Sequence, residues 1–418
     1  MSSKVTKNEA LDYHRVPTPG KVAIATTTKL ESQRDLSLAY SPGVAYPCEE
    51  IQKDPELAYE YTSKRNLVAV ISNGTAVLGL GDIGAIASKP VMEGKAVLFK
   101  KFAAVDSFDI EVDETDIDKF CQIVKAISPT FGGINLEDIK APECFEIEKR
   151  LIEELDIPVM HDDQHGTAII TTAALMNASE MMNKKLEDMK VVVVGAGASA
   201  VACSTMYKQA GIQNLIMCDS KGVVHTGRND LNKYKLDFVT DKATTMEEAF
   251  KDADMVLGLS RPGSFTKELI ALMAEEPIVF TLANPTPELF PEEIREVRPN
   301  AIIGTGRSDF PNQVNNVLGF PFIFRGALDV QTKKINMEMK IAAAKAIANL
   351  AKEPLTADLK ALFGDLNYGR DYIIPAPFDK RLMVEVSSAV ANAAYETGVA
   401  RVKEFNLEAY REKLSHMV

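Results

Sequence analysis

Two pairs of adjacent carboxylates stand out in this sequence because of what precedes them. Glu137-Asp138 and Asp162-Asp163 each follow a short apolar run, which places each pair where a strand is expected to end. The carboxyl ends of strands in an open α/β sheet form the ligand crevice, so carboxylates there can hold a hard divalent cation that prefers oxygen ligands. Acidic turn residues are also common as simple solvated groups. The repetition of the pattern favours a metal site.

A lysine and a tyrosine are candidates for proton transfer. Lys95 directly precedes the apolar run Ala96–Phe99, which predicts a buried strand. A lysine partly withdrawn from water has a lowered pKa and can act as a base. Tyr40 precedes a Ser-Pro-Gly turn that could hold its hydroxyl in a cleft, although a tyrosine beside a turn more often only packs.

A glycine-rich turn of the pattern G-x-G-x-x-A follows four consecutive valines. It contains Gly195, Gly197, Ala198, Ser199 and Ala200. Such a turn after a buried strand lets a pyrophosphate sit on a helix amino terminus. Asp219, nineteen residues after Ala200, lies where the ribose-binding acid of a dinucleotide fold is expected. The alternative is a doubly wound fold that binds no dinucleotide.

The residues around this acid leave the choice of coenzyme open. Asp219 can accept hydrogen bonds from an unphosphorylated ribose and repel a 2'-phosphate, which favours NAD. Lys221 follows two residues later and could meet that phosphate, which favours NADP. The sequence therefore predicts that both coenzymes are used.

The elements that position these residues follow from hydrophobic periodicity and turn signals. In the first half the pattern predicts a hairpin of Leu67–Ser72 with Ala76–Leu80, a strand at Val105–Val112, and helices at Asp116–Ile127 and Gly166–Met182. In the second half it predicts strands and alanine-rich helices at Asn214–Cys218, Ala253–Leu259, Ile278–Ala283, Ala301–Ile303, Asn336–Leu350 and Leu382–Val402.

This alternation indicates an α/β protein of more than one domain. We expect an amino-terminal α/β substrate domain at 1–160, followed by a Rossmann-type, doubly wound dinucleotide-binding domain at 161–390. The segment 391–418 is expected to form a carboxy-terminal helix that packs back on the body. A length of 418 residues is compatible with this organisation.

Composition excludes several classes of partner. A net charge of -12 argues against nucleic acid or an anionic membrane surface, and any anionic substrate must be held by local cations. The amino terminus has no apolar signal core, no stretch is long enough to cross a bilayer, and the five cysteines form no CxxC pair. We therefore expect a cytoplasmic protein with reduced thiols.

An ordered set of motifs closely resembles malic enzyme over residues 10 to 390. The motifs lie at Asp35–Val44, Leu78–Gly84, Leu136–Asp138, His161–Ala168, Asn284–Thr286 and Asn312–Asn316. The length is similar to that of the small microbial form, without the long amino-terminal extension or the fused phosphotransacetylase-like domain of some relatives.

The resemblance implies oxidative decarboxylation of (S)-malate to pyruvate and CO2 by a homodimer, with reduction of NAD or NADP and a requirement for Mg2+ or Mn2+. The implied metal ligands are Glu137, Asp138 and Asp163. The implied base is Lys95 and the implied acid is Tyr40, with Asp162 beside the lysine. Lys95, Asn284 and Asn316 are the implied substrate-binding residues, and Asn284 also lies at the coenzyme.

One position departs from the family pattern. Larger malic enzymes carry an arginine for the substrate carboxylate where this chain has Ala76, and Arg307 or the two asparagines could substitute. Two other functions remain open. An amino-acid dehydrogenase-like oxidoreductase also pairs a lysine with a dinucleotide domain but does not need the carboxylates, and a non-catalytic dinucleotide-sensing protein would need neither Lys95 nor Tyr40.

Overall fold

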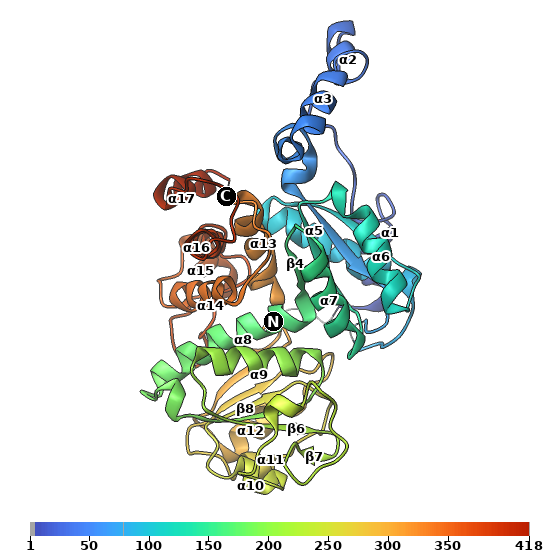
Figure 1. Cartoon of the computed structure of the whole chain (residues 1–418). Helices are drawn as coiled ribbons and strands as arrows, with labels where there is room; N and C mark the ends of the chain where they lie inside the picture. Colours follow the sequence, from blue (N-terminus) through green and yellow to red (C-terminus); the bar gives the residue numbers. More distant parts are fainter. Residues whose placement is uncertain (1–4, 78, 418) are drawn as a thin grey trace.

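The computed structural model describes residues 5–77 and 79–417 and contains two largely parallel β-sheets (Figure 1). The first sheet has the order β2-β1-β3-β4, with β1 at Leu67–Ser72, β2 at Asp106–Glu111, β3 at Gly133–Leu136 and β4 at Val159–His161. The second has the order β10-β9-β8-β5-β6-β7, with strands at Lys190–Val194 (β5), Asn214–Asp219 (β6), Gly222–Val223 (β7), Met255–Gly258 (β8), Ile278–Thr281 (β9) and Ile302–Thr305 (β10).

The α/β fold with an amino-terminal domain and a Rossmann-type domain is confirmed. β5 pairs in parallel with both β6 and β8, and only the short β7 runs antiparallel in its pairing with β6. Val191 to Val194 are buried, as expected for a central strand covered on both faces by helices. The strand order reverses between β5 and β8, which is the topological switch point where doubly wound sheets bind ligands.

The helices connect the strands and cover the sheets. Those before the second sheet are α1 (Lys7–Arg15), α2 (Gln33–Ala39), α3 (Ala45–Lys53), α4 (Ala58–Tyr61), α5 (Ala85–Ala103), α6 (Ile117–Ile127), α7 (Glu143–Glu154) and α8 (Asp162–Met181). Those after β5 are α9 (Ala198–Ala210), α10 (Met246–Phe250), α11 (Lys267–Ile270), α12 (Pro291–Val297), α13 (Phe320–Asp329), α14 (Met337–Ala351), α15 (Ala357–Phe363), α16 (Arg381–Glu396) and α17 (Leu407–Ser415).

Helix α8 joins the two sheets, and the chain after β10 returns to the first one. A single apolar core extends from Val68 of β1 through α8 to Val191 of β5. Within it, Phe99 of α5 packs edge-on against Phe320 and Phe324 of α13, with ring centroids 4.8 and 5.4 Å apart. The second half of the sequence therefore covers the first sheet, and the boundaries expected at residues 160 and 390 stay predictions.

The predicted hairpin after Leu67–Ser72 is wrong. β1 pairs in parallel with β2 and β3, and 76–80 contributes only a bridge between Val77 and Gly81, while residue 78 lies outside the described part of the chain. Gly74 has φ +68°, and a Cβ there would lie 2.2 Å from the Gly84 carbonyl oxygen. The glycine turn thus packs against the start of α5 instead of reversing a strand.

The predicted buried strand at Ala96–Phe99 is also wrong, because this run lies inside α5. The buried positions of that helix recur every three or four residues, as the period of an α-helix requires: Ala85, Ser88, Met92, Lys95, Ala96, Phe99 and Ala103. Four consecutive apolar residues are too few to distinguish the period of an α-helix from that of a β-strand. In the described part of the chain, no helix is both long and apolar enough to cross a membrane.

Candidate active site

The register of the first sheet brings the two carboxylate pairs together. β3 and β4 are parallel neighbours in which Leu136 pairs with His161. The residues that follow these partners are Glu137-Asp138 on one strand and Asp162-Asp163, at the start of α8, on the other. Both pairs consequently leave the same edge of the sheet side by side, as the sequence predicts.

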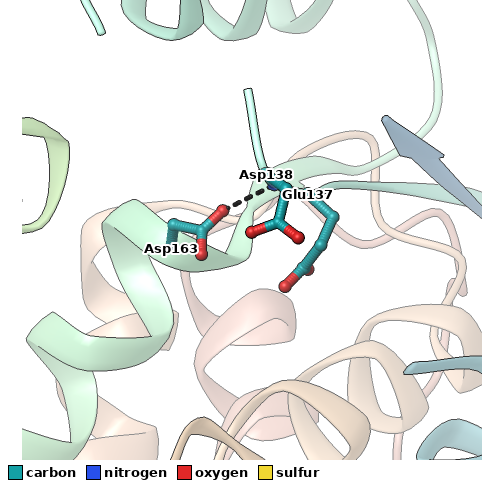
Figure 2. A group of neighbouring side chains, drawn as sticks. All are labelled: Glu137, Asp138 and Asp163. Atoms are coloured by element: carbon teal, nitrogen blue, oxygen red, sulfur yellow. Dashed lines mark hydrogen bonds between the residues drawn. The ribbon is translucent and has the colours of Figure 1, made fainter. Parts of the chain in front are cut away.

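Three of these carboxylates can share a cation. One oxygen each from Glu137, Asp138 and Asp163 lie within 4.8 Å of one another (Figure 2). The Asp138 backbone amide donates a hydrogen bond of 2.8 Å to Asp163 Oδ2, which ties the two loops together. Asp138 has φ +53°, a left-handed conformation that is uncommon outside glycine and tends to occur where a site requires it.

The chemistry of this donor set fits Mg2+ or Mn2+. All three donors are carboxylate oxygens, the ligands that hard cations prefer. Burial raises the pKa of Glu137 well above its ordinary value, and nearby Asp163, Asp162 and Asp138 add to the increase despite the opposing charge of Lys95. A bound cation would offset this repulsion between buried carboxylates.

Lys95 lies between two carboxylates, in the middle of α5. Its ammonium group donates to Asp162 Oδ2 at 2.6 Å and lies 2.8 Å from Glu137 Oε1, above the Phe320 ring. Burial lowers the pKa of Lys95, but the charges of Asp162 and Glu137 outweigh it and raise this pKa above its ordinary value. The predicted lowering of the Lys95 pKa is therefore wrong, because Asp162 and Glu137 both stabilise the ammonium form.

Asp162 connects the lysine to Asn316. The Asn316 amide donates to Asp162 Oδ2 at 3.1 Å, and Thr167 Oγ1 donates to Asn316 Oδ1 at 3.2 Å. Gly166 gives this contact its space, since a Cβ there would lie 2.2 Å from Asp162 Oδ1 and 2.8 Å from the Asn316 amide. A segment of the second half of the chain is thereby joined to the first sheet's edge.

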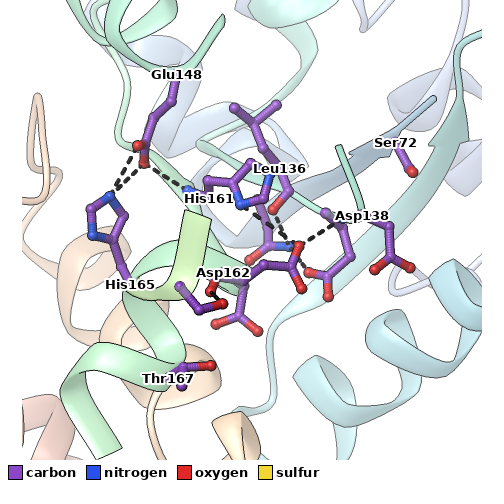
Figure 3. Close-up of polar contacts among 12 residues, drawn as sticks. Ser72, Leu136, Asp138, Glu148, His161, Asp162, His165 and Thr167 are labelled. Atoms are coloured by element: carbon purple, nitrogen blue, oxygen red, sulfur yellow. Dashed lines mark hydrogen bonds and ion pairs between the residues drawn. The ribbon is translucent and has the colours of Figure 1, made fainter. Parts of the chain in front are cut away.

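Two supporting residues were missed by sequence reasoning. Asn135 donates to Glu137 Oε2 at 2.8 Å, and its position two residues before Glu137 was a usable signal because alternate strand residues share a face. Glu148 of α7 accepts from the His161 backbone amide at 2.8 Å and lies 3.0 Å from His165 Nε2 (Figure 3). Nothing in the local sequence of α7 marks that glutamate as different from its neighbours.

The glycine-rich turn occupies the switch point of the second sheet. Gly195 has φ +135°, and a Cβ there would lie 2.4 Å from the Leu259 carbonyl oxygen, so this position requires glycine. Gly197 is open on its Cβ side and precedes α9, which begins at Ala198 and buries Ala200. Ser199 Oγ donates to the Asp163 carbonyl at 2.7 Å, so the first turn of α9 directly contacts the acidic cluster.

Asp219 ends β6 as expected, but its carboxylate is fully engaged. Arg228 donates to both of its oxygens at 2.8 and 3.0 Å, and Lys235 donates at 2.6 Å. Burial opposes ionisation, yet these hydrogen bonds lower the pKa of Asp219 to about 2. Lys221 is exposed and paired with Asp230 at 2.6 Å. The two cations on Asp219 were not recognised because they lie on the loop after the short strand β7.

The remaining predicted residues come from other segments of the chain. Tyr40 is 71% exposed at the end of α2. Asn284 follows β9 and donates to the Gly306 carbonyl at 3.5 Å. Arg307 pairs with Asp309 and donates to the Pro285 carbonyl. Ala76 contributes only its backbone amide, which donates to the Asp138 carbonyl at 3.0 Å.

The fold and the site define an α/β protein in which a Rossmann-type dinucleotide domain contacts an acidic, lysine-containing cluster. Two family profiles match the chain: malic enzyme, N-terminal domain, at residues 19–152, and malic enzyme, NAD binding domain, at residues 164–372. The chain belongs to the malic enzyme family.

Individual relatives agree with this assignment. The NADP-dependent malic enzyme of Halomonas elongata is 56% identical over 94% of this chain and 95% of its own length. The crystal structure of malic enzyme from Pyrococcus horikoshii superposes with a TM-score of 0.90 at 43% identity, over 98% of this chain and 95% of that one. A probable NADP-dependent malic enzyme of Rickettsia prowazekii is 57% identical over 99% of this chain but only 54% of its own length. The chain thus spans about half the length of several curated relatives.

Proposed function

We propose that this chain catalyses oxidative decarboxylation of (S)-malate to pyruvate and CO2, with reduction of NAD or NADP and dependence on Mg2+ or Mn2+. The observation that carries the proposal is the contact between Ser199 of the dinucleotide turn and Asp163 of the acidic cluster. A nicotinamide coenzyme bound at this turn would lie near a cluster suited to a 2-hydroxy acid. We further propose that the protein is a cytoplasmic homodimer, with the five free thiols supporting the location.

Glu137, Asp138 and Asp163 would hold the cation, which supplies Lewis-acid polarisation of the C2 oxygen of malate. Lys95 would take the C2 hydroxyl proton as hydride leaves for the nicotinamide. A cation held by Glu137 would offset part of the charge that stabilises the Lys95 ammonium, which would bring the lysine closer to a neutral base. Asp162 keeps the Nζ atom directed into the site.

The reaction also requires groups that bind the malate carboxylates and a group that protonates the product enolate. Asn316, next to Asp162, and Asn284 are the proposed amides for the malate carboxylates, since Ala76 offers no guanidinium. Loss of CO2 leaves an enolate whose C3 must be protonated, and Tyr40 is the proposed donor.

The test is malate-dependent formation of reduced coenzyme, followed by its absorbance, with NAD and NADP and with and without Mn2+. The proposal expects turnover that disappears when the cation is chelated and returns when it is restored. Metal-independent oxidation of an amino acid would instead identify the dehydrogenase-like alternative. Coenzyme binding without turnover of either substrate would identify a dinucleotide sensor.

A further inference from the structure

Glu288 is a buried carboxylate between β9 and α12 that the proposed mechanism does not use. The residue is 2% exposed. The Ser260 backbone amide donates to Glu288 Oε1 at 2.9 Å, and the Ala283 backbone amide donates to Oε2 at 3.1 Å. The two donors belong to different loops, because Ser260 follows β8 and Ala283 follows β9. One side chain therefore connects two loops at the carboxyl edge of the second sheet.

The surrounding backbone has the shape that this carboxylate requires. A Cβ on Gly258, the last residue of β8, would lie 2.7 Å from Glu288 Cδ and 2.9 Å from Oε1, so the side chain occupies the space that this glycine leaves. The Gly263 backbone amide also donates to the Glu288 carbonyl at 2.9 Å. The loop after β8 is consequently bound to Glu288 both near its beginning and near its end.

A carboxylate at this position costs free energy that an apolar side chain would not. Burial raises the pKa of Glu288, and backbone amides, first those of Ser260 and Ala283, oppose the increase. Burying a charge is unfavourable unless hydrogen bonds compensate for it. Because each oxygen accepts from a separate loop, replacing either oxygen by a donor or an apolar group would release one loop. The two hydrogen bonds therefore set the spacing of the loops.

The two loops lie where the nicotinamide half of the coenzyme is expected. In a doubly wound sheet the two mononucleotide halves bind on opposite sides of the switch point. Here the dinucleotide turn follows β5 and Asp219 ends β6, which leaves the ends of β8 and β9 for the second half. The loop after β8 reaches the turn directly, since a Cβ on Gly195 would lie 2.4 Å from the Leu259 carbonyl oxygen. Ala283 immediately precedes Asn284, the amide proposed for malate.

We propose that Glu288 is a positioning residue that holds the loops after β8 and β9 in the shape that receives the nicotinamide half of the coenzyme. It acts through the Ser260 and Ala283 amides, and through Ala283 on Asn284, without touching the coenzyme itself. The inference rests on the coenzyme part of the proposed function and gives a role to a residue outside the acidic cluster. It does not depend on malate turnover.

Coenzyme binding to Glu288→Gln tests this role without malate. The glutamine amide group can accept a hydrogen bond from one loop but presents a donor to the other, so one of the two hydrogen bonds is lost. In isothermal titration, NADH and NADPH should bind about tenfold more weakly than to the wild type, as loss of one such contact implies. Adenosine monophosphate, which contains only the adenosine half, should bind with unchanged affinity. Glu292→Gln, at an exposed glutamate of α12, is the control and should bind NADH normally.

Hydrogen exchange of the backbone amides gives a readout that needs no ligand. Peptides that contain Ser260 and Ala283 should exchange faster in Glu288→Gln than in the wild type, whereas peptides of the first sheet should not change. Gly258→Ala is the second variant if Glu288→Gln fails to fold, because its Cβ displaces the same carboxylate while Glu288 is retained. It should weaken NADH binding in the same selective way.

Three results would each overturn the proposal: unchanged NADH affinity in the variant, an equal loss of affinity for adenosine monophosphate, or unchanged exchange of the Ser260 and Ala283 peptides. A wild-type chain that does not oxidise malate, together with the expected loss of NADH affinity in Glu288→Gln, would refute the proposed function and still support this inference.

Discussion

Lys95 shows how strongly neighbouring charges decide the chemistry of one residue. Its sequence context identifies a buried lysine but gives no sign of Asp162, which follows it by 67 positions and contacts it at 2.6 Å. Burial alone would favour the neutral amine, whereas two carboxylates at hydrogen-bond distance favour the ammonium. The position of a candidate base can therefore be predicted from sequence, but its protonation cannot be predicted without its partners.

The metal assignment predicts a selective loss in Asp163→Ala. Removing one of three anionic ligands should raise the Mn2+ concentration needed for half-maximal activity by on the order of a hundredfold, as one lost charge-assisted contact implies. Coenzyme affinity, measured by fluorescence of the reduced form, should change little. Asp241→Ala, at an exposed aspartate of the second domain, controls for loss of one charge. Unchanged Mn2+ dependence would remove Asp163 from the ligand set.

Arg228, in place of Lys221, is the cation that we expect to distinguish NADP from NAD. Because Arg228 and Lys235 compensate the charge of Asp219, that acid repels a 2'-phosphate less than the sequence alone suggests. Arg228→Ala should raise KM for NADP about tenfold more than KM for NAD, since a charge-assisted hydrogen bond is worth about 1.5–3 kcal/mol. Lys221→Ala, which removes an exposed cation paired with Asp230, is the matched comparison. Equal effects of Arg228→Ala on both coenzymes would contradict this account.

At the scale of elements, long periodic helices and valine-rich strands were predictable, whereas two short apolar runs were assigned wrongly. The valine run of β5 and the glycine turn after it combine composition, length and position, so the Rossmann half could be recognised from sequence. The runs at 76–80 and 96–99 carry only local hydrophobicity, and tertiary contacts turned one into a loop and the other into part of α5. The carboxylate cluster was predictable because it depends only on strand ends lying at one edge.

The start of α8 yields a prediction at Gly166. Alanine normally stabilises a helix by about 1 kcal/mol relative to glycine. At this position its Cβ would overlap Asp162 and Asn316, so Gly166→Ala should lower kcat/KM by on the order of a hundredfold while the fold is retained. Gly94→Ala on α5, where a Cβ meets only the Lys21 ammonium at 3.6 Å, is the control and should keep normal activity. Normal activity in Gly166→Ala would show that the Asp162–Asn316 contact is dispensable.

The contacts of Glu148 on α7 with His161 and His165 predict a contribution to the free energy of unfolding that is lost in acid. Burial raises the pKa of Glu148, but His165 and Lys340 outweigh it and lower the value from 4.5 to about 2. A depressed pKa stabilises the folded state above the unfolded value, and this contribution, about 3 kcal/mol, is lost as pH falls from about 4.5 toward 2. Urea unfolding of Glu148→Gln and wild type should therefore differ most above pH of about 5 and converge near pH of about 2. A constant difference would exclude this linkage.

At the scale of the whole molecule, the acidic charge and the exposed apolar side chains of α2 and α3 have opposite consequences. A net charge of -12 opposes association of two copies and entry of a dianionic substrate. Association as the proposed homodimer would therefore depend on exposed apolar side chains such as Leu36, Leu38 and Tyr46. Sequence motifs could name Tyr40 but could not predict that its side chain is 71% exposed at the end of α2.

The proposed homodimer predicts an assembly that depends on protein concentration. As wild-type protein is diluted below the dimer dissociation constant, the dimer fraction measured by mass photometry should fall. Inert carrier protein controls for adsorption to surfaces. Leu38→Asp, which places a charge on an exposed apolar position of α2, should raise the protein concentration at which dimers form, because association of an acidic chain depends on apolar contact. Leu362→Asp replaces a similarly exposed leucine on α15 and should leave the dimer fraction unchanged. Equal dimer fractions for Leu38→Asp and the wild type would show that α2 takes no part in the association.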